Sequence, residues 1–307
     1  MRIEEALDLF VVQLRADGRS SHTVEQYRRH VLLLARWVGE ESKAGGGRAR
    51  RARGRSLGRV EGIGHQDLAR FLVSPAARQR PDGTEKKATS TNALRTSLRC
   101  FFAYLSDAGI IEENPARLIR RARCASPPPR AMSRGEQERL LAALAAASGP
   151  GAERDHMLFA LMLATGLRLG SAIAVERRDV DLARGELRVR RTKGDRPDVV
   201  YLGRGIRRQL QRYLKRRGLA DGDPLFQGLP GAPISARSVR RRFGLWCRAA
   251  GIEGGFSPHS LRHSFATDLY QRTRDLLLVQ GALGHASTGS TMVYARPPVG
   301  QRRRALG

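Results

Sequence analysis

Apolar residues recur at helical spacing in the first third of the chain. From residue 24 to residue 38, apolar side chains follow one another at steps of three and four, which places them on one face of a helix. Thr23 and Gln26 predict a capping box at its start. Residues 94–105 repeat the pattern, and Gly109 predicts the end of that second helix. The first third is therefore predicted to be helical.

The later part of the chain also shows helical patterns. Ser133 and Glu136 predict a capped helix start. Residues 155–165 form an apolar helical run that stops at Gly166, and residues 205–217 are predicted to be helical as well. These segments predict a second helical region.

Two short segments between these helices have the alternating pattern of strands. Residues 186–191 place Leu187 and Val189 on one side, and residues 197–202 are predicted to return as the antiparallel partner. Lys193 would then lie at the tip of the hairpin. The second region is therefore predicted to be mixed rather than purely helical.

A proline-rich stretch separates the two regions. Residues 120–130 read RRARCASPPPR, which is typical of an interdomain linker. We expect a helical domain over residues 1–125 and an α+β domain over residues 126–307. The predicted fold class is mainly α with a small antiparallel β-sheet.

The charge of the chain points to a polyanionic partner. Lys and Arg number 56 against 29 Asp and Glu, a net charge of +27. Such an excess favours nucleic acid, although membrane surfaces are also anionic. No apolar run is long enough to span a bilayer, and the first ten residues lack the pattern of a signal peptide. The three cysteines lie far apart, so we expect a cytoplasmic protein without disulfides or structural zinc.

Arginines gather in two places that could contact such a partner. Residues 45–55 hold five arginines and are predicted to be a basic loop. Residues 235–249 are predicted to form a helix with Val239, Phe243 and Trp246 facing inward. Four arginines of this helix are then available on its outer side: Arg237, Arg240, Arg241 and Arg242. Of these, Arg237, Arg240 and Arg241 are the candidate DNA contacts.

A candidate anion site lies at residues 257–263. Ser257 and Pro258 form a strong helix start. His259 and Arg262 are three residues apart, so they share one face at the positive end of this helix, where a phosphate is favoured. His259 and His263 could instead be a metal pair, but no third ligand accompanies them. The sequence thus favours a phosphate site without a metal.

Three further residues carry chemistry only in combination. Arg168 follows the helix break at Gly166, His285 lies in a glycine-containing turn, and Tyr294 comes nine residues later. Each of these residues alone is more often structural than catalytic. Together, their order and spacing resemble the tyrosine recombinase (phage integrase) family, in particular its Xer-like and integron- or transposon-type integrase members. The matching segments are TGLR at 165–168, TKG at 192–194, HSLRH at 259–263 and LGHAS at 283–287 followed by Tyr294.

The resemblance implies a clamp on one DNA phosphate. Arg168 and Arg262 would hold its non-bridging oxygens, because a planar guanidinium matches two oxygens and stays charged. His259 and His285 would add hydrogen bonds and assist proton transfer. Ser171 stands where the family pattern has a glutamate.

The resemblance also implies covalent catalysis without a cofactor. Tyr294 would attack phosphorus to form a 3′-phosphotyrosyl bond, and Lys193 would protonate the departing 5′ oxygen. Fixed cations would take the place of a metal. The implied partner is double-stranded DNA, bound by a homo-tetramer on two synapsed sites. An accessory protein that sets the direction of exchange is compatible with this interpretation.

Three alternatives remain open from the sequence. A type IB topoisomerase-like enzyme would use the same chemistry but relax plasmids without a specific site. A catalytically silent DNA-binding accessory protein would bind DNA and form no covalent bond. A metal-dependent transposase would need a carboxylate triad, and Asp179, Asp181 and Asp268 show no recognisable arrangement for one.

Overall fold

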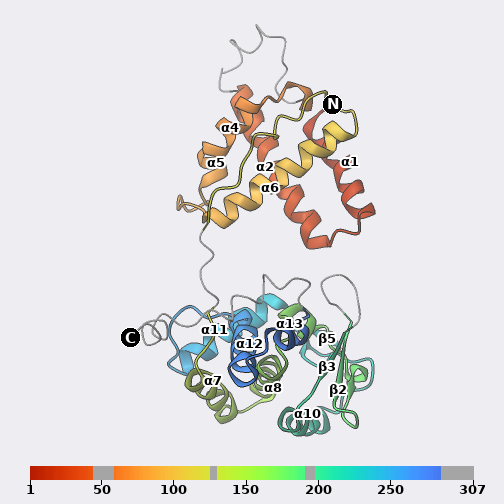
Figure 1. Ribbon diagram of the computed structural model, residues 1–307, viewed down its shortest axis with the longest axis vertical. Coiled ribbons are helices and arrows are strands. Elements are labelled where there is room, and N and C mark those ends of the chain that lie inside the picture. Colours follow the sequence, from red (N-terminus) through yellow and green to blue (C-terminus); the bar gives the residue numbers. More distant parts are fainter. Residues whose placement is uncertain (44–58, 125–129, 191–197, 285–307) are drawn as a thin grey trace. The chain divides into compact units, whose positions relative to one another are not determined.

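The computed structural model describes residues 1–43, 59–124, 130–190 and 198–284 of the chain (Figure 1). The chain divides into two compact units, Met1–Ser126 and Pro127–Gly307. The predicted fold class is confirmed, because helices dominate and the strands form only small antiparallel sheets. Within the described ranges, no helix combines the length and apolarity needed to cross a bilayer.

The N-terminal unit is helical. Two long helices pack against each other and against the first helix, and their facing side chains include a cluster of aromatic rings. The ring centroids of Phe10 and Phe101 lie 5.6 Å apart, and those of Phe101 and Phe102 lie 5.1 Å apart. The helices are α1 (Ile3–Ala16), α2 (Ser21–Lys43), α4 (His65–Val73), α5 (Pro75–Arg78) and α6 (Ala88–Asp107), with a short 3-10 helix at Val60–Gly62.

The predicted start of the second helix is wrong by one turn. Helix α2 already begins at Ser21, because the Ser20 hydroxyl accepts a hydrogen bond from the Thr23 N–H at 3.3 Å. Thr23 therefore lies inside the helix rather than at its cap. The predicted end of the helix over residues 94–105 is confirmed, since α6 ends at Asp107 and Gly109 follows with a φ of +69°.

Helix α8 lies at the centre of the C-terminal unit. It contacts α7, α10 and α12, and nearly all of its apolar side chains are buried. The predicted capping box of α7 is confirmed, because the Ser133 N–H donates to Glu136 Oε2 at 2.7 Å. The helices are α7 (Arg134–Ala146), α8 (Pro150–Thr165), α9 (Leu169–Ile173), α10 (Arg204–Arg217), α11 (Ala236–Ala249), α12 (Pro258–Thr273) and α13 (Leu276–Leu283), with a 3-10 helix at Arg177–Asp179.

The predicted hairpin exists and is part of a three-stranded sheet. Strands β2 (Glu186–Val189) and β3 (Asp198–Tyr201) pair antiparallel, with Val189 opposite Asp198. Strand β1 (Val180–Asp181), which the alternation is too short to reveal, pairs with the other edge of β2. A second small sheet joins β4 (Gln227–Leu229) and β5 (Ala232–Pro233).

Candidate active site

The site is built around the first two turns of α12. The helix begins at Pro258, as predicted, and the Ser257 N–H donates to Ser260 Oγ at 3.2 Å. Proline suits this first position because it has no N–H to leave unsatisfied. His259 in the first turn is exposed, whereas Arg262 is only 4% exposed. The helix therefore offers a histidine to solvent directly above a buried arginine.

Arg262 joins three segments that lie far apart in the sequence. Its Nη1 donates to the Gly166 carbonyl at 2.7 Å, and its Nη2 donates to the Leu283 carbonyl at 2.6 Å. Gly166 caps the end of α8, and Leu283 is the last residue of α13. Carbonyls at helix ends carry partial negative charge, so they offset the cost of burying the guanidinium. The hydrogen bonds bring the TGLR segment and the start of LGHAS to α12.

Gly166 is required by the packing of this junction. Its φ is +67°, a left-handed conformation that glycine adopts without strain. A Cβ atom there would lie 2.4 Å from Cδ1 of Phe265, which is closer than any real contact. The chain then continues to Arg168, which is half-buried at the start of α9. The glycine thus lets α12 approach the turn that carries Arg168.

The electrostatics of the site favour an anion. Partial loss of water around its ring, followed by the positive charges of Arg262 and Arg168, lowers the pKa of His259 below its usual value. Both arginines therefore lie within electrostatic reach of the same histidine. The rings of His259 and His263 meet edge to face with centroids 4.5 Å apart. In the part of the chain that the structure describes, no three His, Cys, Asp or Glu side chains gather as a metal ion requires.

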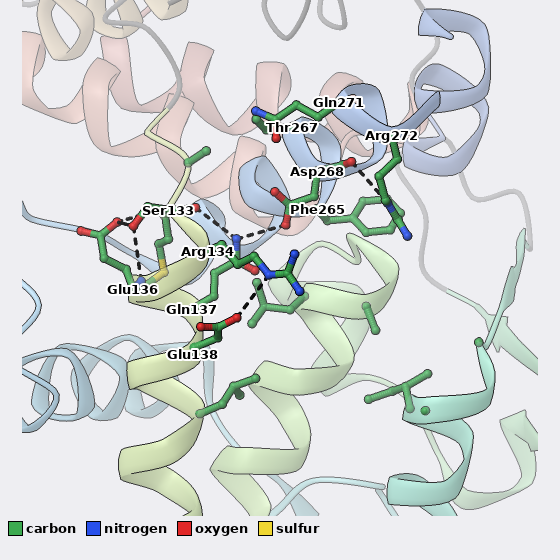
Figure 2. Close-up of a pocket in the computed structure, with 18 residues that line it drawn as sticks. Ser133, Arg134, Glu136, Gln137, Glu138, Phe265, Thr267, Asp268, Gln271 and Arg272 are labelled. Atoms are coloured by element: carbon green, nitrogen blue, oxygen red, sulfur yellow. Dashed lines mark hydrogen bonds and ion pairs between the residues drawn. The ribbon is translucent and has the colours of Figure 1, made fainter. Parts of the chain in front are cut away.

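Helix α12 is attached to the start of the C-terminal unit on its other side (Figure 2). Ser264 Oγ accepts from the Met132 N–H at 2.8 Å, and Gln137 Nε2 donates to Asp268 Oδ2 at 3.1 Å. Gln137 and Asp268 lie on the wall of a pocket between α7, α8, α12 and the first residues of α10. None of the predicted catalytic residues that the structure describes lines this pocket. The contacts instead fix the helix that carries His259 and Arg262.

A buried carboxylate holds α11, the helix with the predicted DNA contacts. Asp155 of α8 is 1% exposed, and it accepts from Arg154 Nη2 and from Trp246 Nε1, both at 2.8 Å. It also accepts from Arg242. Arg242 and Trp246 belong to α11. The sequence patterns did not predict this cluster, although the charged pair Arg154 and Asp155 beside an apolar helical run was a visible signal.

The outward placement of Arg242 is therefore wrong. Its guanidinium turns toward Asp155, because a second cation and a further hydrogen bond offset the cost of burying this carboxylate. The predicted inward placement of Val239 and Phe243 is confirmed, since both are buried. The other three arginines predicted to face outward, Arg237, Arg240 and Arg241, are exposed.

Several predicted residues lie outside the described part of the chain. They are Lys193 in the connection between β2 and β3, His285, Tyr294 and the arginine-rich residues 45–55. Ser171 is buried in α9. Among the described residues, the carboxylates considered for a transposase do not gather into a triad. Asp179 pairs with Arg190, Asp181 pairs with Arg184, and Asp268 accepts from Gln137.

The comparisons with known proteins identify the family. The sequence profile of the phage integrase family matches residues 130–299. Tyrosine recombinase XerC of Vibrio parahaemolyticus is 32% identical over 301 residues, which cover 95% of this chain and 88% of that protein. Tyrosine recombinase XerC of Serratia marcescens is 35% identical over 231 residues, 74% of each chain. The chain belongs to the phage integrase family, the tyrosine recombinases.

Solved structures share the fold at lower identity. XerH site-specific recombinase bound to its difH substrate has a TM-score of 0.71 and 22% identity, over 92% of this chain and 80% of that one. A lambda integrase dimer bound to a COC′ core site has a TM-score of 0.69 and 19% identity, over 96% and 77%. These matches extend across both units.

Proposed function

We propose that Arg168, His259 and Arg262 hold the phosphate at which this protein cuts DNA, and that Tyr294 attacks it. The observation that carries the proposal is the junction at Arg262, which joins the TGLR turn, the start of α12 and the end of α13. Both arginine charges also act on His259. The two arginine charges disfavour the protonated form of His259. A phosphate bound here would offset those charges and accept hydrogen bonds from all three side chains.

As a tyrosine recombinase, the protein is an enzyme that cleaves and rejoins DNA in site-specific recombination. In the proposed step, the Tyr294 hydroxyl gives its proton to His259 or His285 as its oxygen bonds to phosphorus, and the bond from phosphorus to the 5′ oxygen breaks. Lys193 gives a proton to that departing oxygen, while His259 and His285 donate hydrogen bonds to the phosphate. The new 5′ hydroxyl, or one from another strand, attacks the phosphotyrosyl bond and reverses the step. The energy of the original bond is kept in that link, so rejoining needs no ATP.

The proposed partner is double-stranded DNA, contacted by the exposed arginines of α11. Arg237, Arg240 and Arg241 are placed by the buried cluster at Asp155, and arginine suits the phosphate backbone. We further propose that four protomers assemble on two synapsed sites in the cytoplasm. The lambda integrase tetramer on a Holliday junction, which shares this fold, supports such an assembly. An accessory protein that sets direction belongs to the same proposal.

The test is covalent capture of DNA in EDTA. Purified protein is incubated with nicked duplexes from its host DNA, denatured, and the DNA still attached is sequenced. We expect one recovered sequence with the wild type and none with Tyr294→Phe. Tyr201→Phe is the matched control, because Tyr201 is an exposed tyrosine on β3 and should leave the yield unchanged.

Each other result points to a different function. Equal background with wild type and Tyr294→Phe, under conditions where both bind DNA, contradicts catalysis and favours a silent DNA-binding protein. Tyrosine-dependent relaxation of plasmids that lack the recovered sequence favours a topoisomerase-like enzyme. A requirement for magnesium contradicts the proposed chemistry.

A further inference from the structure

Helix α10 has a basic outer face that no step of the proposed reaction uses. One side of the helix is buried through Ile206, Leu210, Tyr213 and Leu214. The opposite side carries exposed cations at steps of four, four and three residues, or roughly 6, 6 and 4.5 Å along the axis. These cations form the α10 stripe: Arg204, Arg208, Arg212 and Lys215.

The charges of the α10 stripe are uncompensated. Helix α10 contains no aspartate or glutamate, and among the described residues no carboxylate forms an ion pair with any member of the stripe. Neighbouring Arg216 shows the contrast, since it pairs with Glu153 of α8. Like charges four residues apart repel, and Arg204 and Arg208 also lie near the positive end of the helix. A merely solvated helix face usually mixes the two signs, so this arrangement indicates a polyanion.

We propose that the α10 stripe binds the phosphate backbone of duplex DNA outside the site where strands are cut. Guanidinium groups match phosphate oxygens, and backbone contacts carry no sequence information. The exposed positions of α10 include no aromatic or large apolar side chain. Stacking of single-stranded bases and insertion into a membrane surface would both need such side chains. Duplex backbone is the polyanion that these residues fit.

The α10 stripe is separate from the arginines of α11. Helix α10 packs on α8, whereas α11 packs mainly on α7, α9 and α12 and reaches α8 through Asp155. Figure 1 shows the two helices at different edges of the C-terminal unit. The stripe therefore adds a second contact surface, suited to holding DNA of any sequence while the other surface engages a recombination site.

The test measures how salt weakens binding to a 40-base-pair duplex of unrelated sequence, in EDTA and in a Tyr294→Phe background. Each phosphate contact adds about 0.9 to the steepness with which log affinity falls against log salt. Loss of three contacts should therefore reduce the magnitude of this slope by about 2.7. We expect this change in the full-length triple variant Arg204→Gln, Arg208→Gln, Arg212→Gln. Its melting temperature should stay equal or rise, because repulsion within α10 is removed.

A matched control removes the same charge elsewhere in the C-terminal unit. Arg134, Arg178 and Arg184 are exposed, and each already pairs with a carboxylate. Replacing these three arginines by Gln should change the magnitude of the salt slope by less than about 0.9, the value of a single phosphate contact. An unchanged slope in the α10 variant, or an equal drop in the control, overturns the proposal. Binding of the α10 variant to anionic vesicles and to single-stranded DNA is measured as well. If the variant loses binding to either of these but keeps its binding to the duplex, the proposal is also overturned. Because no covalent step is involved, the result is independent of the proposed catalysis.

Discussion

The interior of the N-terminal unit consists mainly of aromatic and aliphatic side chains, whereas the interior of the C-terminal unit encloses more charged side chains. Among the described residues, Asp67 is the buried charged side chain of the first unit, and its carboxylate accepts from the Gly64 N–H at the start of α4. The described part of the second unit buries four: Arg154, Asp155, Asp179 and Arg262. Buried ion pairs are weak sources of stability but strong constraints on geometry. The first unit is therefore held together mainly by apolar packing. In the second unit, buried charged side chains take up part of the interior and fix the positions of its arginines.

The largest expected effect tests the charge cluster of the second unit. Asp155→Ala leaves Arg154 and Arg242 without their partner, which should cost about 3–5 kcal/mol of unfolding free energy. Trp246 reports this unit and Trp37 the other, so denaturation is followed by fluorescence in a Trp37→Phe background. The control Asp181→Ala, at an exposed pair, should cost less than about 1 kcal/mol. Equal losses from both substitutions would remove the distinction.

The next effect tests the close approach of α12 to the TGLR turn. Gly166→Ala should cost about 1–3 kcal/mol through its positive φ and its clash with Phe265, and should lower the yield of covalent complex. Gly170→Ala is the control, because a methyl group at that position would meet nothing within 4 Å and alanine favours the helix. A wild-type yield from Gly166→Ala would show that the Arg262 junction tolerates displacement.

A smaller effect is expected in the apolar core of the first unit. Ile3 is buried at the start of α1, and Ile3→Val should cost about 1 kcal/mol. The Trp37 signal should shift while the Trp246 signal stays unchanged. Val12→Ala, at an exposed position of the same helix, should change stability by less than about 0.5 kcal/mol. A shift in the Trp246 signal would mean that the two units unfold together.

The smallest effect concerns pH. Burial, followed by the charges of Arg29 and Lys86, lowers the pKa of His30 from 6.5 to about 4. The unfolded chain then binds the proton more readily, so the stability of the first unit is complete above pH 6.5 and falls as pH drops toward 4. The loss should stay below about 1 kcal/mol, since the ring is partly exposed and screened. His30→Gln should reduce the difference in unfolding free energy between pH 6.5 and pH 4. If the variant and the wild type show the same difference, His30 is not its source.

Local patterns predicted the elements that carry the site. The start of α12 follows from Ser257 and Pro258, and the β2–β3 hairpin follows from alternation, because both depend on neighbours in the sequence. The catalytic set came from the order of motifs, and the catalytic roles of all six residues stay predictions; the structure describes the positions of Arg168, His259 and Arg262 among them.

Long-range contacts could not be predicted in this way. The acceptors of Arg262 are main-chain carbonyls 96 and 21 residues away, and no side-chain pattern marks a carbonyl. Arg242 was placed outward because its partner Asp155 lies 87 residues earlier. The start of α2 was missed for a local reason, since Ser20 and Thr23 are both good caps and only the hydrogen bond distinguishes them.

The carbonyl acceptors of Arg262 have a consequence for mutational scanning and for evolution. Any residue at positions 166 and 283 supplies a carbonyl, so no substitution deletes the acceptor itself; it can only move it. An alanine scan would therefore report the loss of the Arg262 donor directly, whereas at positions 166 and 283 it would report only backbone strain or lost packing, never the loss of an acceptor. The orientation of this arginine is thus inherited with the path of the backbone, and the sequence around it is free to drift wherever that path is kept.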